Sequence, residues 1–425
     1  MLITNKINKI EGEITIPGDK SISHRAIMLS SISKGSSKIQ GFLRGEDCLR
    51  TIDCFRQLGI EILDNNSEII VHGRGPSGLK EPEDILDVGN SGTTIRLISG
   101  ILAGYEFLTI ITGDKSIRNR PMARIAVPLR QMGANIEGRK KGNLAPLVIR
   151  GGNLNGIDYK SPVPSAQIKS AILLAGLYSE GKTIVREEFT SRDHTERMLR
   201  ALGADIKVED TVISLKKSQL YSQNIQIPGD ISSAAFFMAA AAALPGSHLI
   251  LKKIGLNPTR TGIIDVLNMM GADIEIDNVF VSGGEKIGDI IIRGRKLNGV
   301  NIGGGIIPRL IDEIPVIAII AAIADGKTRI TGAEELKVKE TNRITAMVKE
   351  MQKLGIRVKE LPDGMEIEGP NKINGGVVES YGDHRIAMAM AIGGLFSDEV
   401  IKIKDSQCIG ISFPDFTEKL KEITR

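Results

Sequence analysis

Residues 228–246 read PGDISSAAFFMAAAAALPG, and this stretch decides how the chain folds. Asp230 precedes the apolar run, and aspartate is a preferred residue at the N-terminus of a helix. Residues 231–243 are apolar on nearly every face of a helix, which predicts a helix buried on all sides. A turn at Gly246 ends the helix and leads into a strand.

The same arrangement recurs about every 70 residues along the whole chain. The turns that end the apolar helices fall at Gly35, Gly104, Gly181, Gly246, Gly326 and Ser397-Asp398. A second, amphipathic helix recurs in nearly the same phase and closes at Gly59, Gly133, Gly203, Gly271 and Gly355, with a sixth copy over 413–423. We interpret the chain as six βαβ-like repeats in the α/β class, three to a domain, each with one buried and one outer helix.

Length and composition agree with a two-domain globular protein. Single cores stop growing near about 250–300 residues, and this chain has 425. A net charge of +4 and 4% aromatic residues argue against a nucleic-acid partner. No apolar run reaches the length of a membrane span, and the N-terminus lacks the apolar run of a signal peptide, so we expect a cytoplasmic protein. Three cysteines without a CxxC pair predict neither a disulfide framework nor a zinc site.

The starts of the buried helices share residues that suit an anion. Ser, Asp and Gly open them, and helix N-termini carry free N–H groups with partial positive charge. These starts lie at 17–21, 89–93, 164–167, 228–232, 311–313 and 382–385. If the buried helices of a domain run parallel, their N-termini converge on one surface that favours anions.

Cationic side chains recur at these helix starts and at those of the outer helices. They are Lys20, Arg25, Arg96, Lys169, Arg385, Arg120, Arg192, Lys339 and Arg343. A single surface Lys or Arg is usually solvated, but their recurrence at helix starts predicts a polyanionic small molecule as ligand. The five histidines show no metal-ligand spacing. Glu340, three residues before Arg343, is either half of a solvated pair or a general acid/base, and spacing alone favours the solvated pair.

Two stretches at helix starts, Pro17–Arg25 and Asn90–Arg96, are similar to the first and second signatures of the EPSP synthase family of enolpyruvyl transferases, and motifs along nearly the whole chain resemble that family. Further matches, in the order of the family, are 118–121, 165–167, 310–313, 338–343 and 381–385. The resemblance implies the enolpyruvyl transferase fold, with one domain over 1–17 plus 228–425 and the other over 18–227.

The resemblance also implies the reaction and the residues that perform it. The enolpyruvyl group of phosphoenolpyruvate would pass to the 5-hydroxyl of shikimate 3-phosphate, in the shikimate pathway of aromatic amino-acid biosynthesis, without a metal or an organic cofactor. Residues implied to bind shikimate 3-phosphate are Lys20, Ser21, Arg25, Ser165, Gln167, Arg192, Asp312 and Lys339. Those implied to bind phosphoenolpyruvate are Lys20, Gly92, Arg120, Gln167, Arg343 and Arg385, with Asn90, Arg96 and Lys169 in support.

The implied chemistry is addition followed by elimination. Glu340 would deliver and later remove the methylene proton, Asp312 would act as base at the 5-hydroxyl, and Lys20 would touch that oxygen and the leaving phosphate. His384 is a further candidate for proton transfer, although orientation of its neighbours is the more ordinary role. We expect a monomer with no macromolecular partner.

Two residues depart from the family pattern. Ala166 removes a phosphate-binding hydroxyl, for which Lys169 could compensate, and Ile411 stands where many members have a lysine.

Two alternatives remain. An enolpyruvyl transferase acting on UDP-N-acetylglucosamine usually has a reactive loop cysteine, and none lies between Cys54 and Cys408. A non-catalytic phosphometabolite or RNA-end binding protein could use the same repeats, but it gives Glu340 and Asp312 no reason to accompany the cations.

Overall fold

The computed structural model describes residues 1–424 and divides into two compact units. Unit 1 consists of Met1–Pro17, Gly229–Phe280 and the chain from Lys286 onward, and unit 2 consists of Gly18–Pro228 and Val281–Glu285. Each unit has its own hydrophobic core. Among residues 1–424, no helix is long and apolar enough to cross a membrane.

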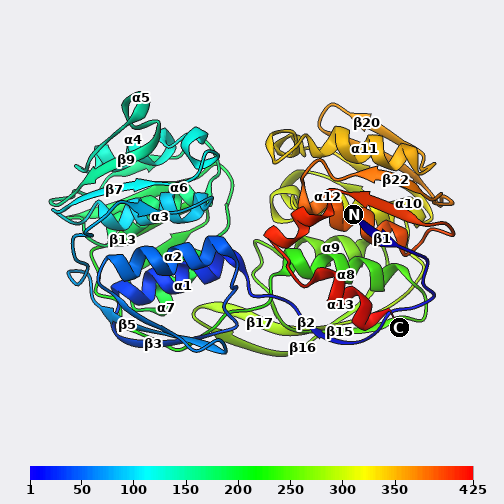
Figure 1. The fold of residues 1–425 in the computed structure, drawn as a ribbon, viewed down its shortest axis with the longest axis horizontal. Coiled ribbons are helices and arrows are strands. Elements are labelled where there is room, and N and C mark those ends of the chain that lie inside the picture. The colour runs from blue at the N-terminus through cyan, green and yellow to red at the C-terminus, as the bar shows by residue number, and fades with distance from the viewer. Residues whose placement is uncertain (425) are drawn as a thin grey trace. The chain divides into compact units, whose positions relative to one another are not determined.

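The core of unit 2 is built around three buried helices, α1 (Lys20–Ile32), α3 (Gly92–Leu102) and α6 (Ala166–Gly176) (Figure 1). The outer helices are α2 (Glu46–Gln57), α4 (Ala123–Gln131) and α7 (His194–Ala201), with short helices α5 (Arg139–Gly142) and η1 (Ile117–Asn119). Close packing of α3 on α6 requires Gly100, because an added Cβ would lie 2.2 Å from the carbonyl oxygen of Ala171.

Three four-stranded sheets surround these helices in unit 2. The first sheet has the spatial order β14 (Ile225–Gln226), β3 (Lys34–Gln40), β5 (Glu68–Arg74) and β4 (Glu61–Asp64). The second has the order β6 (Leu86–Asp87), β7 (Leu108–Thr112), β9 (Leu144–Arg150) and β8 (Asn135–Gly138). The third has the order β10 (Asp158–Lys160), β11 (Lys182–Arg186), β13 (Val212–Lys216) and β12 (Ile206–Glu209). In each sheet the first two strands are parallel and the others are antiparallel.

Unit 1 repeats this plan around α8 (Ile231–Ala243), α10 (Ile314–Ile323) and α12 (His384–Gly394). Its outer helices are α9 (Gly262–Met269), α11 (Arg343–Lys353) and α13 (Phe416–Ile423), with 3-10 turns η2 (Gly304–Arg309), η3 (Glu334–Val338) and η4 (Ser406–Ile411). Its first sheet has the spatial order β16 (Asp273–Ser282), β17 (Glu285–Arg293), β15 (His248–Gly255) and β2 (Glu11–Thr15). Its second has the order β18 (Asn301–Ile302), β19 (Gly326–Ile330), β21 (Gly364–Gly369) and β20 (Val358–Leu361). Its third has the order β1 (Leu2–Thr4), β23 (Ile401–Lys404) and β22 (Gly376–Glu379).

The α/β class and the six repeats predicted from the sequence are confirmed, and each repeat is larger than a βαβ unit. After the parallel pair joined by a buried helix, an outer helix leads to two antiparallel strands, for example β6, α3, β7, α4, β8 and β9. The strand that precedes α1 leaves its own repeat: β2 pairs with β15 of unit 1, and β14 supplies the parallel partner of β3. The sixth sheet has three strands.

Candidate active site

The start of α3 in unit 2 gathers three guanidinium groups. Arg96 lies on α3, Arg120 follows η1, and Arg124 lies in the first turn of α4. Burial, followed by the positive charges of Arg120 and Arg124, lowers the pKa of Arg96 to about 10. Such mutual repulsion among cations is relieved when an anion binds between them, so this is an electrostatically favourable site for a phosphate or carboxylate.

Neutral side chains orient these cations. Arg96 donates a hydrogen bond to the amide oxygen of Gln167, on α6, and Arg120 donates to the amide oxygen of Asn90 at 2.7 Å. Gly92 makes their approach possible, since an added Cβ would lie 2.9 Å from Nη1 of Arg120 and 3.4 Å from Nη1 of Arg96. The structure therefore brings together five of the residues that the resemblance implied for binding phosphoenolpyruvate or for supporting its binding.

A second cationic region of unit 2 is formed at the start of α1. Asp19 caps the helix by accepting a hydrogen bond from the backbone N–H of Ile22 at 2.9 Å. Lys20 lies 3.3 Å from a carboxylate oxygen of Asp47, and its side chain is 40% exposed. An exposed ion pair of this kind is weak, so the ammonium group is able to exchange Asp47 for an anionic ligand.

Arg25 is held in one orientation by hydroxyl and carbonyl groups. Its guanidinium donates to Thr195 Oγ1 at 2.7 Å, to Ser170 Oγ at 2.9 Å and to the carbonyl oxygen of Ser21 at 2.9 Å. Burial lowers the pKa of Arg25 to about 10; nearby carboxylates oppose the shift, and the charge of Arg192 adds to it. Arg25 and Arg192 are therefore neighbouring cations, and the resemblance implied that both bind shikimate 3-phosphate.

Near the start of α6, the side chain of Lys169 is paired with two carboxylates. Ser165 occupies the N-cap position without making a capping hydrogen bond. Lys169, which was expected to compensate for Ala166 as a phosphate ligand, is 1% exposed and lies 2.7 Å from Glu187 and 2.8 Å from Glu196. The ammonium group of Lys169 is thus paired with two carboxylates inside unit 2, and its expected supporting role beside Ala166 stays a prediction.

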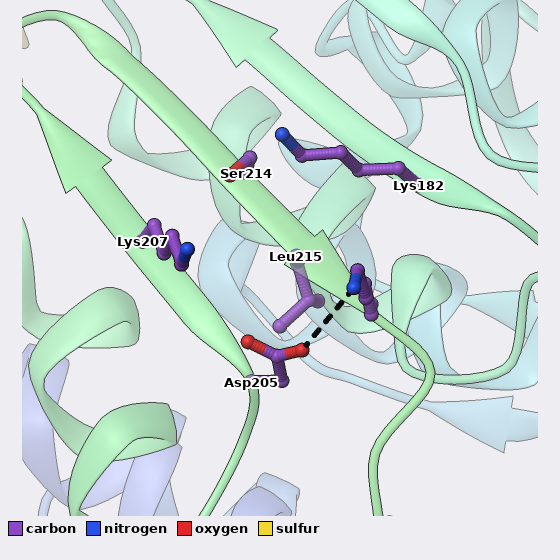
Figure 2. Close-up of a pocket in the computed structure, with 6 residues that line it drawn as sticks. Lys182, Asp205, Lys207, Ser214 and Leu215 are labelled. Carbon is purple, nitrogen blue, oxygen red and sulfur yellow. Dashed lines mark ion pairs between the residues drawn. The ribbon is translucent and has the colours of Figure 1, made fainter.

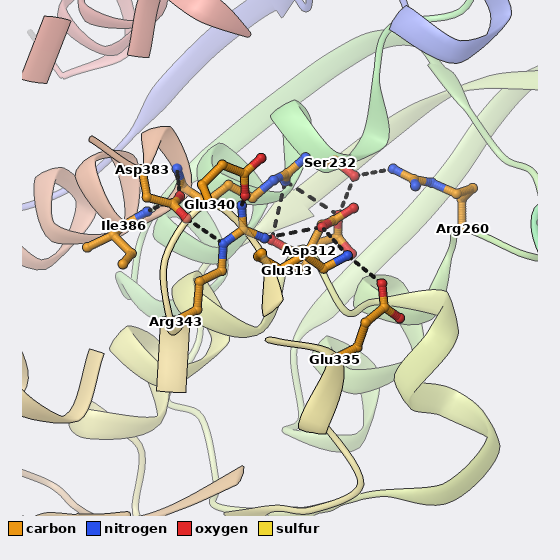
Figure 3. Close-up of polar contacts among 11 residues, drawn as sticks. Ser232, Arg260, Asp312, Glu313, Glu335, Glu340, Arg343, Asp383 and Ile386 are labelled. Carbon is orange, nitrogen blue, oxygen red and sulfur yellow. Dashed lines mark hydrogen bonds and ion pairs between the residues drawn. The ribbon is translucent and has the colours of Figure 1, made fainter. Parts of the chain in front are cut away.

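In unit 1, Arg343 at the start of α11 contacts three carboxylates (Figure 3). Its Nε lies 2.7 Å from Asp383, its Nη1 lies 3.3 Å from Asp312, and its Nη2 lies 2.6 Å from Glu340. Burial lowers the pKa of Arg343, but Asp383 and the other carboxylates outweigh burial and raise it above the usual value. Asp312 and Glu340, 14% and 51% exposed, are thereby brought to one guanidinium group.

Lys339 and Arg385 lie beside this group. Lys339 Nζ is 3.8 Å from Asp312 and 2.7 Å from Glu335. Arg385, in the first turn of α12, donates to the carbonyl oxygen of Asp312 at 3.2 Å. Asp383 caps α12 by accepting from the backbone N–H of Arg385 at 2.8 Å, and His384 is the first residue of that helix.

Glu313 is a buried carboxylate next to Asp312 to which sequence reasoning gave no role. It lies 3.8 Å from Arg385 and accepts a hydrogen bond from Ser232, which in turn accepts one from Arg260 (Figure 3). Burial raises the pKa of Glu313, while Arg260 and Arg385 oppose the shift. Glu313 therefore orients Arg385.

Four other residues of the site were not predicted from the sequence, for different reasons. Arg124 carried a usable signal, because it lies one helical turn after Arg120. Asp47, Ser170 and Thr195 carried none, because their contacts with Lys20 and Arg25 depend on residues far apart in the chain.

Two cavities of unit 2 lie away from these helix starts. A pocket of about 160 Å³ on the third sheet is lined by Lys182, Asp205, Lys207, Ser214, Leu215 and Lys216 (Figure 2). A larger one of about 660 Å³ includes Tyr105 and Tyr178 in its lining. Neither is lined by a residue that the motifs predicted, so we place the candidate site at the helix starts.

The chain is similar to known proteins over nearly its whole length. The profile of one family, EPSP synthase (3-phosphoshikimate 1-carboxyvinyltransferase), matches residues 4–420. A curated 3-phosphoshikimate 1-carboxyvinyltransferase from Alkaliphilus metalliredigens is 73% identical over 100% of both chains, and one from Bacillus cytotoxicus is 54% identical over 97% of this chain and 98% of its own. A solved EPSP synthase from Acinetobacter baumannii superimposes with a TM-score of 0.95 at 46% identity, covering 99% of this chain and 97% of its own.

Proposed function

The chain belongs to the EPSP synthase family, and on that premise we propose how its own residues transfer the carboxyvinyl group of phosphoenolpyruvate to shikimate 3-phosphate. The family, the fold class and the transferase activity expected from the motifs are confirmed. The observation that carries the residue assignments is the recurrence of cations at helix starts, where helix N-termini and guanidinium groups both favour anions.

The proposed site carries enough positive charge to neutralise both substrates. Each substrate carries a phosphate of about −1.5 to −2 and a carboxylate, so the two together bring roughly −5 to −6. The cations assigned to them are Lys20, Arg25, Arg96, Arg120, Arg192, Lys339, Arg343 and Arg385. The planar guanidinium group of arginine binds both carboxylate and phosphate through paired hydrogen bonds, which suits the arginines among these cations.

The residues divide between the two substrates. Shikimate 3-phosphate is assigned to Lys20, Ser21, Arg25, Ser165, Gln167, Arg192, Asp312 and Lys339. Phosphoenolpyruvate is assigned to Lys20, Gly92, Arg120, Gln167, Arg343 and Arg385, with Asn90 and Arg96 orienting Arg120 and Gln167. Lys169 is left out of both sets because its charge is already paired.

Two carboxylates are proposed to move the protons. Asp312 takes the proton of the 5-hydroxyl as this oxygen attacks C2 of phosphoenolpyruvate, while Glu340 protonates C3. The resulting tetrahedral intermediate loses phosphate, which takes the proton that Asp312 accepted, so Asp312 is a carboxylate again. Glu340 recovers a proton from the methyl carbon, and Lys20 stabilises the leaving phosphate. Phosphoenolpyruvate bound to Arg343 competes with Glu340 for this guanidinium and so releases the carboxyl group of Glu340 from their 2.6 Å pair. His384 is proposed as an accessory proton-transfer group.

The proposal also includes the domain division, with one domain over 1–17 plus 228–425 and the other over 18–227. It further includes a monomeric state and a cytoplasmic location. The support for the division is the separate hydrophobic core of each unit.

The test is release of inorganic phosphate by purified protein with shikimate 3-phosphate plus phosphoenolpyruvate. Each substrate is omitted in turn as a control. We expect release that requires both substrates and that disappears in Lys20→Met, which removes the ammonium group and keeps the length of the side chain. Saturable binding of both compounds without phosphate release would instead identify a non-catalytic phosphometabolite binding protein.

A further inference from the structure

Three charged side chains lie buried together in unit 2. Lys169 of α6 is 2.7 Å from Glu187 and 2.8 Å from Glu196 of α7, and the three side chains are 1%, 0% and 3% exposed. We call these residues the Lys169 cluster. Burial lowers the pKa of Lys169, but Glu196 and Glu187 outweigh burial and raise it, so the cluster contains a true ammonium group. Because buried ion pairs often add little stability compared with apolar residues, we expect the role of this cluster to lie in the residues that it orients.

The cluster holds the segment that follows β11. Glu187 accepts hydrogen bonds from the backbone N–H of Ser191 at 3.2 Å and from its hydroxyl at 2.6 Å. Lys169 donates to the carbonyl oxygen of the same serine at 3.3 Å. Ser191 is therefore fixed through its N–H, its C=O and its side chain at once. The next residue is Arg192, so the direction in which its side chain leaves the backbone depends on these bonds.

The same two helices also orient Arg25. Ser170 follows Lys169 on α6 and Thr195 precedes Glu196 on α7. Their hydroxyl oxygens are 2.6 Å apart, and both accept hydrogen bonds from Arg25. Any shift of α6 against α7 would therefore disturb the guanidinium of Arg25.

We propose that the Lys169 cluster is a positioning device that sets Arg192 against Arg25 for binding of shikimate 3-phosphate. The inference deepens the proposed function and rests on it. Lys169, Glu187 and Glu196 act through other residues and touch no substrate. The positive charge of Lys169 thus acts inside unit 2, where it fixes the positions of Arg25 and Arg192 relative to each other.

The test uses Lys169→Met and Glu187→Gln in the full chain. The glutamine variant keeps the shape of the glutamate and leaves the Lys169–Glu196 pair intact, so it serves where the methionine variant folds poorly. In steady-state assays of phosphate release we expect the KM for shikimate 3-phosphate to rise about 10- to 100-fold, because misplacing a binding group by about 1 Å has effects of this size. The KM for phosphoenolpyruvate should stay within about twofold. Lys252→Met, which removes the Lys252–Asp289 pair of unit 1, is the matched control and should change neither constant.

A double-mutant cycle separates positioning from general stabilisation. In an Arg192→Ala background, Lys169→Met should raise the KM for shikimate 3-phosphate by less than about twofold, because the group through which the cluster acts is gone. Folded cluster variants with an unchanged KM for shikimate 3-phosphate would overturn the inference, as would equal increases in both KM values or additivity with Arg192→Ala. Wild-type protein that releases no phosphate would instead overturn the proposed function.

Discussion

Replacing His24 by glutamine should flatten the dependence of stability on pH. His24 is fully buried on α1, its Nδ1 lies 2.7 Å from Thr51 Oγ1, and its Nε2 has no hydrogen-bond partner among the described residues. Burial, followed by the charges of Lys20 and Arg25, lowers its pKa from 6.5 to about 3. The folded state thus rejects a proton that the unfolded state accepts.

The magnitude follows from the two pKa values. The stability associated with neutral His24 is fully present above the unfolded pKa of 6.5 and is lost as the pH falls toward about 3. Between pH 7 and pH 5 the unfolded state gains about 2 kcal/mol from protonation of this histidine, while the folded state gains almost nothing.

Urea unfolding followed by circular dichroism at pH 7 and pH 5 provides the assay. Other titrating groups are common to both proteins and cancel in the comparison. The free energy of unfolding of His24→Gln should therefore fall by about 2 kcal/mol less than that of the wild type over this interval. His72→Gln, at a partly exposed histidine on β5, is the control and should follow the wild type. A difference below about 0.5 kcal/mol between His24→Gln and wild type would refute the view that folding keeps His24 neutral.

Three further changes test the site and the packing. Gly92→Ala should raise the KM for phosphoenolpyruvate, because the new Cβ would press on Arg120 at 2.9 Å, and steady-state kinetics with an unchanged KM would contradict this steric reasoning. Gly100→Ala should destabilise unit 2 by about 1–3 kcal/mol in urea unfolding, since its Cβ would meet the carbonyl oxygen of Ala171 at 2.2 Å; a wild-type midpoint would show that α3 and α6 separate without cost. Glu340→Gln should lower kcat by about 10²–10⁴, the usual contribution of a positioned acid or base, and a kcat within tenfold of wild type would remove Glu340 from the proton-transfer role.

Much of the candidate site was predictable because its signals are local. A helix start is recognised from a few consecutive residues, so the capping roles of Asp19, Asp230 and Asp383 follow from the sequence itself. The pair formed by Glu340 and Arg343 is also local, because residues three apart are neighbours on a helix.

The partners of Lys169 could not be predicted in the same way. Glu187 and Glu196 lie 18 and 27 residues farther along the chain, on the far side of β11 and at the start of α7. Nothing in the residues around Lys169 distinguishes an ammonium group aimed at a ligand from one paired inside the protein. Only the packing of α6 against α7 decides between them.

The amino-acid sequence by itself determined the six repeats, the buried helices and the cationic helix starts, because hydrophobic periodicity and capping act over a few residues. Tertiary structure alone decided that β2 pairs with β15 rather than within its own repeat, that Asp383 and Asp312 join Glu340 around Arg343, and that the charge of Lys169 is neutralised internally. These contacts join residues far apart in the chain, and their energies depend on burial and distance, which exist only once the helices and sheets have packed.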